Sequence, residues 1–187
     1  MAFLYHFVPA DVRGDILYPL NELKSVYSDL YKKEVGKYTR VPASTVMGWK
    51  VPKLGCLWND VLHFSPVSPQ KLKEASVETG GDPDRVISFY QVDPNLLDAR
   101  RTVVYLYHDR GLSLADNESA YPPSEPDEIR DYDPKGVKEL SADISDETKK
   151  YYEEIRKKGV KPIMFRRVTH VLYKGTLDIS DLKIVSV

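Results

Sequence analysis

Three histidines stand in the middle of short apolar segments, where a polar side chain needs a specific role. They are His6 in residues 4–9, His63 in residues 61–66 and His170 in residues 166–172. An imidazole can accept or donate a hydrogen bond, bind a metal or move a proton near neutral pH. Ligand binding, metal binding and acid–base catalysis are therefore the chemistries to weigh, beside a purely structural role for each ring.

The spacing of these histidines argues against a metal site. Zinc ligands commonly occur as close pairs such as H-x-x-x-H, whereas these histidines lie far apart in the sequence without clustered carboxylates beside them. The single cysteine, Cys56, excludes an intramolecular disulfide and any multi-cysteine zinc site. A lone cysteine fits a reducing compartment, so we expect a cytoplasmic protein.

The common signatures of nucleophilic and nucleotide chemistry are missing from the sequence. A serine hydrolase favours a G-x-S-x-G turn, which is absent, and Ser65 is followed by a proline. Neither a Walker loop nor a G-x-G-x-x-G run occurs. Any nucleotide site in this chain must therefore be of a less common kind.

Composition predicts one compact domain over residues 1–187. The chain is 42% hydrophobic and 11% aromatic, which is enough to bury a sizeable core. A net charge of -1 and a pI near 6.4 argue against duplex DNA as a partner, because phosphate contacts require a broad basic surface. No apolar run approaches the length of a membrane-spanning helix, so we expect no membrane association.

The elements that must position the histidines follow from periodicity and capping. Apolar residues at helical spacing predict a helix over residues 16–35. A second helix begins after Ser68, an N-cap followed by proline, and ends before residues 80–81, which are both glycine. Residues 85–92 and 101–107 are rich in β-branched and aromatic side chains and are interpreted as a possible antiparallel pair of strands.

The second half of the chain contains a long acidic, proline-rich segment at residues 109–145, interpreted as a loop that is either functional or disordered. Ser145 then caps a helix that runs to Lys158. Residues 161–174 and 182–187 are expected to be strands. This order predicts an α+β fold, with a mostly antiparallel split sheet and flanking helices.

The three histidine segments resemble motifs of the ADP-ribosyltransferases, nearest in layout to the DarT-like and RNA 2'-phosphotransferase-like branches. Residues 4–9 resemble the first strand of those proteins, whose histidine holds NAD. Residues 61–66, before the helix at Pro69, resemble their second motif. Residues 166–172, followed by residues 178–185, look like their last motif. The resemblance implies an ADP-ribosyltransferase-like fold and NAD as the ligand.

The resemblance also implies roles for individual residues. His6, with Tyr5 beside it, would hold the ribose of NAD, and Ser65 would help to fix the nicotinamide end. His170 takes the place of the glutamate of the DarT-like branch, and His63 is the second candidate catalytic residue. A glutamate offsets positive charge developing on the sugar, whereas a protonated histidine would repel it.

In the RNA 2'-phosphotransferase-like branch, arginine and histidine surround a phosphate, so the resemblance makes Arg40 and Arg167 candidate phosphate ligands. Tyr90 or Tyr105 could stack on a base. The acidic segment at residues 109–145 favours a protein or a small nucleotide as the acceptor over nucleic acid.

Two alternatives use the same sequence features. Paired histidines can act as general base and general acid on a ribose 2'-hydroxyl, which is the chemistry of a metal-independent ribonuclease. In the other alternative the protein is a non-catalytic interaction module whose binding segment is residues 109–145 and whose histidines are structural.

Overall fold

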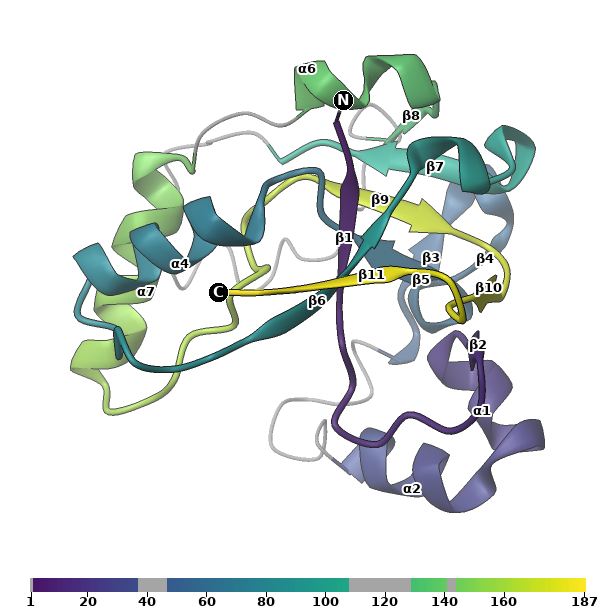
Figure 1. Cartoon of the computed structure of the whole chain (residues 1–187), viewed down its shortest axis with the longest axis horizontal. Coiled ribbons are helices and arrows are strands. Elements are labelled where there is room, and N and C mark those ends of the chain that lie inside the picture. The colour runs from purple at the N-terminus through teal and green to yellow at the C-terminus, as the bar shows by residue number, and fades with distance from the viewer. Residues whose placement is uncertain (1, 37–46, 108–128, 141–143) are drawn as a thin grey trace.

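The computed structural model describes residues 2–36, 47–107, 129–140 and 144–187. Its architecture is α+β, and every strand pair among these residues is antiparallel (Figure 1). The predicted fold class is confirmed at this level, with antiparallel sheets and helices beside them. None of the helices in the described ranges has the length and apolar character needed to cross a bilayer.

Two main sheets carry the histidine strands. The three-stranded sheet has the order β1 (Leu4–Phe7), β6 (Ser88–Val92), β11 (Lys183–Ser186). The four-stranded sheet has the order β5 (Leu62–Phe64), β9 (His170–Tyr173), β7 (Thr102–Tyr105), β8 (Ile129–Asp131). Tyr5 and Ser65 exchange two backbone hydrogen bonds of 2.9 Å, which join β1 to β5. The sheets are thus linked at the point where two of the histidine strands meet.

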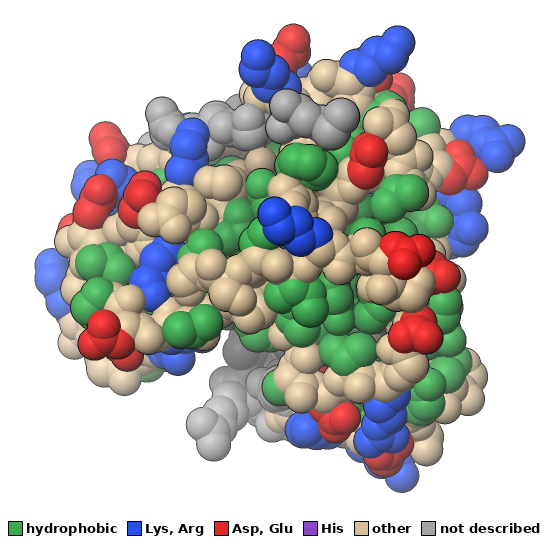
Figure 2. Space-filling model, in the orientation of Figure 1, with side chains coloured by type: hydrophobic (Ala, Val, Ile, Leu, Met, Phe, Trp, Pro, Cys, Tyr) green, Lys and Arg blue, Asp and Glu red, His purple; other side chains and the backbone are tan. Residues whose placement is uncertain are grey.

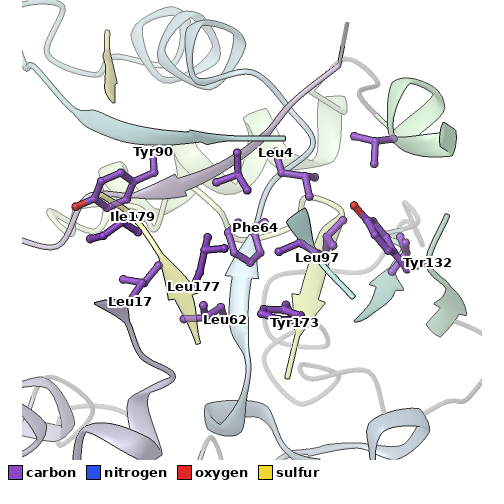
Figure 3. Packing of buried hydrophobic residues seen from close by; sticks show 14 of the residues in the cluster. Leu4, Leu17, Leu62, Phe64, Tyr90, Leu97, Tyr132, Tyr173, Leu177 and Ile179 are labelled. Atoms are coloured by element: carbon purple, nitrogen blue, oxygen red, sulfur yellow. The ribbon is translucent and has the colours of Figure 1, made fainter. Parts of the chain in front are cut away.

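The main core lies between the facing sides of these sheets (Figure 3). Leu4 and Val92 from one sheet and Phe64, Val104 and Val171 from the other are buried in it. Strand alternation turns the remaining side chains of β5, β7 and β9 to the opposite face. That second face is covered by β3 (Lys50–Val51), η2 (Pro52–Leu54), β4 (Cys56–Leu57) and η3 (Trp58–Asp60).

The helix predicted over residues 16–35 is partly wrong. The first two residues form the short strand β2 (Ile16–Leu17), which pairs with β10 (Leu177–Asp178). Two helices follow, α1 (Leu20–Val26) and α2 (Ser28–Gly36), separated by Tyr27 at φ −139°. α1 begins only at Leu20 because Pro19, at its N-cap, lacks the N–H that a longer helix would need.

Two capped helices agree closely with the prediction. The Ser68 hydroxyl accepts from the Lys71 N–H at the start of α4 (Pro69–Glu78), and the Ser145 hydroxyl accepts from the Thr148 N–H at the start of α7 (Asp146–Lys157). The two helices lie side by side at the left of Figure 1. Arg156 of α7 joins them by donating to the Thr79 carbonyl oxygen at the end of α4.

Removing the Ser68 hydroxyl is expected to destabilise the protein modestly. Ser68→Ala leaves an N-terminal N–H of α4 without its acceptor, which typically costs about 1 kcal/mol in the free energy of unfolding. Urea denaturation would measure the change. Ser25→Ala, inside α1, is the matched control and should be neutral or slightly stabilising, because alanine is the better helix former. Equal losses in both variants would contradict a capping role.

The predicted pairing of residues 85–92 with residues 101–107 is wrong. β6 and β7 lie in different sheets, and each pairs with other strands. Between them the chain forms the 3₁₀ turns η4 (Pro94–Leu96) and η5 (Ala99–Arg101), in which the Asp93 and Asp98 side chains accept from the Asn95 and Arg100 N–H groups. These two turns carry the chain from one sheet to the other, so no hairpin forms.

The prediction of one continuous loop at residues 109–145 is wrong for residues 129–140. That stretch forms β8, η7 (Pro134–Gly136) and α6 (Val137–Leu140), since Ile129, Tyr132 and Val137 are buried in the cores. Residues 108–128 and 141–143 lie outside the described residues. The strand expected over residues 161–174 is shorter than predicted, because only β9 forms there.

Candidate functional site

Two of the three histidines meet on the second face of the four-stranded sheet. The His63 and His170 rings, from the neighbouring strands β5 and β9, have centroids 6.2 Å apart and are nearly perpendicular. The Trp58 indole lies 4.7 Å from the His63 ring and 6.2 Å from the His170 ring. Tyr105 lies opposite His170 on β7, with its ring 6.2 Å away. We call Trp58, His63, Tyr105 and His170 the aromatic–histidine cluster.

Both cluster histidines have one ring nitrogen anchored to the backbone. The His63 Nε2 lies 2.9 Å from the Trp58 carbonyl oxygen, and the His170 Nδ1 lies 2.7 Å from the Val168 carbonyl oxygen. A carbonyl oxygen can only accept, so each of these nitrogens carries the proton in a neutral ring. The His63 Nδ1 and the His170 Nε2 are therefore left as acceptors.

These second nitrogens have no hydrogen-bond partner among the described residues. Both side chains are largely covered by the protein: His170 is 5% exposed and His63 is half-buried. An acceptor nitrogen beside aromatic rings can receive a hydrogen bond from a hydroxyl group of a ligand.

His6 lies near His63, but its ring contacts Phe64 of the main core, on the other face of the four-stranded sheet. Its ring extends from the same side of β1 as Leu4 and packs edge-on against Phe64, with centroids 5.5 Å apart. Its Nδ1 is anchored to the Phe7 carbonyl oxygen at 2.6 Å. Phe7, on the opposite face of β1, is exposed, while His6 turns toward the other sheet.

Burial keeps all three imidazoles neutral at physiological pH. Desolvation lowers the pKa of His6 and of His170 to about 4. The pKa of His63 falls to about 3, first through desolvation and then through the positive charges that His170 and His6 would carry. The effect of His6 on His63 shows that the third histidine lies within electrostatic range of the cluster.

Ser65 and Tyr5 lie at this junction, but their polar groups already have protein partners. The Ser65 hydroxyl is buried, and its oxygen accepts from the Val67 N–H at 3.1 Å in the turn before α4. The Tyr5 hydroxyl bonds to Gln91, and burial raises the pKa of Tyr5. Their implied roles in holding NAD stay predictions.

Arg167 is not brought to the cluster. Its buried guanidinium lies 3.7 Å from a carboxylate oxygen of Glu147 and over the ring of Tyr151. Arg167 also has φ +62°, the left-handed region that a non-glycine residue seldom adopts. Its contacts bind it to α7, which no sequence pattern indicated. Arg40, the other candidate phosphate ligand, lies outside the described residues.

Trp58 is the cluster residue to which the sequence assigned no role, although its position five residues before His63 brings both into one short segment. Tyr90, one of the two tyrosines considered for base stacking, is buried in the core between the sheets, whereas Tyr105 belongs to the cluster. Among the described residues, no group of three or more His, Cys, Asp or Glu is arranged to hold a metal ion.

Comparisons with protein-family models, curated proteins and solved structures found no significant match. A functional argument must therefore start from the chemistry of the cluster itself.

Proposed function

We propose that the protein is an ADP-ribosyltransferase-like protein that binds NAD or a related nucleotide at the aromatic–histidine cluster, with His6 nearby. The observation that carries this proposal is the pair of neighbouring rings of His63 and His170, each anchored through one nitrogen and left with an acceptor at the other. Ribose hydroxyls donate to such acceptors.

The uncharged state of the His170 ring also affects whether the protein could transfer ADP-ribose to a protein or small-nucleotide acceptor. Transfer breaks the bond between the ribose and nicotinamide, and positive charge develops on the sugar. A protonated His170 would oppose that charge, but its pKa of about 4 keeps the ring uncharged at neutral pH. A neutral ring accepts from a ribose hydroxyl without supplying the negative charge of a glutamate, so slow transfer is the expected chemistry.

The same pKa values weigh against the ribonuclease alternative. General acid–base catalysis by two histidines needs one ring protonated near neutral pH. With a pKa of about 3 for His63 and about 4 for His170, neither ring holds a second proton near neutral pH.

We therefore favour nucleotide binding over the ribonuclease. Because neither ring changes its charge between pH 6 and 8, we expect the affinity for NAD to be constant over that range.

Calorimetry with NAD, without an added acceptor, tests the proposal. The wild-type protein should give saturable binding, and His6→Ala and His170→Gln should each weaken it about tenfold, the order expected for loss of one well-placed hydrogen bond. Phe7→Ala is the matched control, because Phe7 is on the same strand but points to solvent. It should bind NAD as the wild type does.

Circular dichroism should first show that each variant is folded. No saturable heat with the wild type would overturn the proposal, and so would unchanged affinity in both histidine variants. In that case the rings are structural, and the interaction-module alternative gains weight.

A further inference from the structure

A basic cavity lies away from the aromatic–histidine cluster, between α4, α7 and the chain that leads into β6. Its volume is about 220 Å³. Its charged lining residues are Lys73, Asp82, Arg85, Arg156 and Lys161. Figure 2 shows basic and acidic side chains mixed over the end of the molecule that carries α4 and α7. The cavity differs from that surface, because four cationic side chains line it beside one carboxylate.

Two of the four cations are fixed by the protein. Arg156 donates to the Thr79 hydroxyl at 2.6 Å and to the Ser76 hydroxyl at 2.8 Å. The Lys73 ammonium donates to the backbone carbonyl oxygen of Arg85. Both cations bond to uncharged oxygens in these contacts, so their positive charge is not neutralised there.

The other two cations are uncommitted. Arg85 and Lys161 are exposed, and neither forms an ion pair or a side-chain hydrogen bond with another described residue. The single carboxylate, Asp82, accepts from the Asp84 N–H within its own turn. Four like charges around one small cavity repel each other, and a bound anion would relieve that repulsion.

The wall of the cavity is tightly built around Arg156. A Cβ atom on Gly81 would lie 2.6 Å from the Ser76 carbonyl oxygen and 2.8 Å from the Arg156 Nη2, so only glycine fits here. The close approach of the backbone keeps the guanidinium in one position against α4. Ile87, Pro162 and Met164 supply an apolar wall. A fixed guanidinium beside two exposed cations is well suited to a tetrahedral anion.

A purely structural role explains only part of this arrangement. Arg156 bonds to the last turn of α4, where the helix dipole favours a cation. That role does not require Arg85 or Lys161, which lie on segments outside both helices and contact no helix-end carbonyl. Their positions at the cavity are left unexplained by the fold.

We propose that this cavity is a binding site for a phosphate-bearing small anion, with Arg156 as the fixed ligand and Arg85 and Lys161 closing on it. Its residues are distinct from those of the aromatic–histidine cluster. A volume of about 220 Å³ admits a phosphate or diphosphate group with a small attached moiety. The apolar wall would contact that moiety.

Calorimetry with inorganic phosphate and with pyrophosphate, at ionic strength held constant with sodium chloride, tests the site. We expect saturable binding to the wild type and a loss of at least tenfold in affinity in the Arg85→Gln/Lys161→Gln double variant. Both substitutions are at exposed positions, so the fold should be retained. Lys183→Gln, at an exposed position on β11, is the matched control and should leave the affinity unchanged.

Absence of saturable binding to the wild type, or equal affinity in the double variant, would overturn the proposal. Tighter binding of pyrophosphate than of phosphate would identify a diphosphate ligand, and the reverse order a single phosphate. His170→Gln should leave phosphate binding unchanged, and the Arg85→Gln/Lys161→Gln variant should leave NAD binding at the cluster unchanged. Failure at one site is thereby distinguished from failure at the other.

Discussion

Replacing Glu147 by glutamine is expected to lower the free energy of unfolding by about 3 kcal/mol, because it leaves the buried guanidinium of Arg167 without its counter-charge. Arg167 is 5% exposed, and a Glu147 carboxylate oxygen lies 3.7 Å from its guanidinium. The other carboxylate oxygen accepts from the Tyr107 hydroxyl at 2.5 Å. Glutamine has the same shape as glutamate and can still accept from the Tyr107 hydroxyl. The loss in the free energy of unfolding therefore measures the effect of removing the negative charge.

The backbone conformation at Arg167 makes it costly for the charged side chain to move from its buried position into solvent. Arg167 is held at φ +62° while its carbonyl oxygen accepts from the Thr148 hydroxyl at 2.6 Å. A strained backbone of this kind persists only where neighbouring contacts fix it. The guanidinium therefore cannot swing to solvent without loss of the link between α7 and the chain entering β9.

Urea denaturation of Glu147→Gln at neutral pH is the measurement. Asp131→Asn is the control, because it breaks the ion pair between Asp131 and Lys53 at the surface, where Asp131 is 93% exposed. We expect no measurable loss there, since exposed pairs contribute little. Adding Arg167→Met to Glu147→Gln should recover part of the stability by removing the unpaired charge. Equal stability of Glu147→Gln and Asp131→Asn would refute the buried-charge argument.

Local chemistry predicted the parts of the fold that depend on near neighbours. Ser68 followed by Pro69, and Ser145 followed by two acidic residues, specify helix starts within a few residues of chain. The end of the second helix near Lys158 is local as well, because Gly159 follows it and glycine readily adopts the φ of +71° found there. These features required no knowledge of the rest of the molecule.

Pairing between distant segments could not be predicted in the same way. The strand at Ile16–Leu17 forms because residues 177–178, far along the chain, offer it a partner. Residues 88–92 and 102–105 have the composition of strands, but composition does not say which sheet each one joins. Tertiary contacts decided both cases.

The candidate site shows the same division. That His63 turns away from Phe64 follows from local chain geometry, since successive side chains on a strand face opposite sides. The meeting of His63 with His170 depends on the pairing of β5 with β9, to which only the family resemblance pointed. Arg167 was a candidate ligand only through the family resemblance, and its ion pair with Glu147 depends on where α7 packs.

Acidification below pH 6.5 is expected to destabilise the protein steeply, and the aromatic–histidine cluster supplies a defined part of that loss. The pKa of His170 is about 4 in the fold, below its ordinary value of 6.5. Between these values the unfolded chain binds a proton that the folded chain does not, so stability is full above pH 6.5 and falls with pH toward 4. For the buried His170 this difference corresponds to about 3 kcal/mol. His63 and His6 act in the same direction.

Urea denaturation of the wild type and His170→Gln at several pH values between 6.5 and 5 isolates this contribution, because carboxylates titrate mainly below that range. Glutamine cannot take up a proton, and its amide can still donate to the Val168 carbonyl oxygen. The free energy of unfolding of the variant should therefore fall less steeply, by up to about 1.4 kcal/mol per pH unit. Identical slopes would mean that His170 is protonated in the fold. The neutral acceptor on which the nucleotide proposal depends would then not exist at this position.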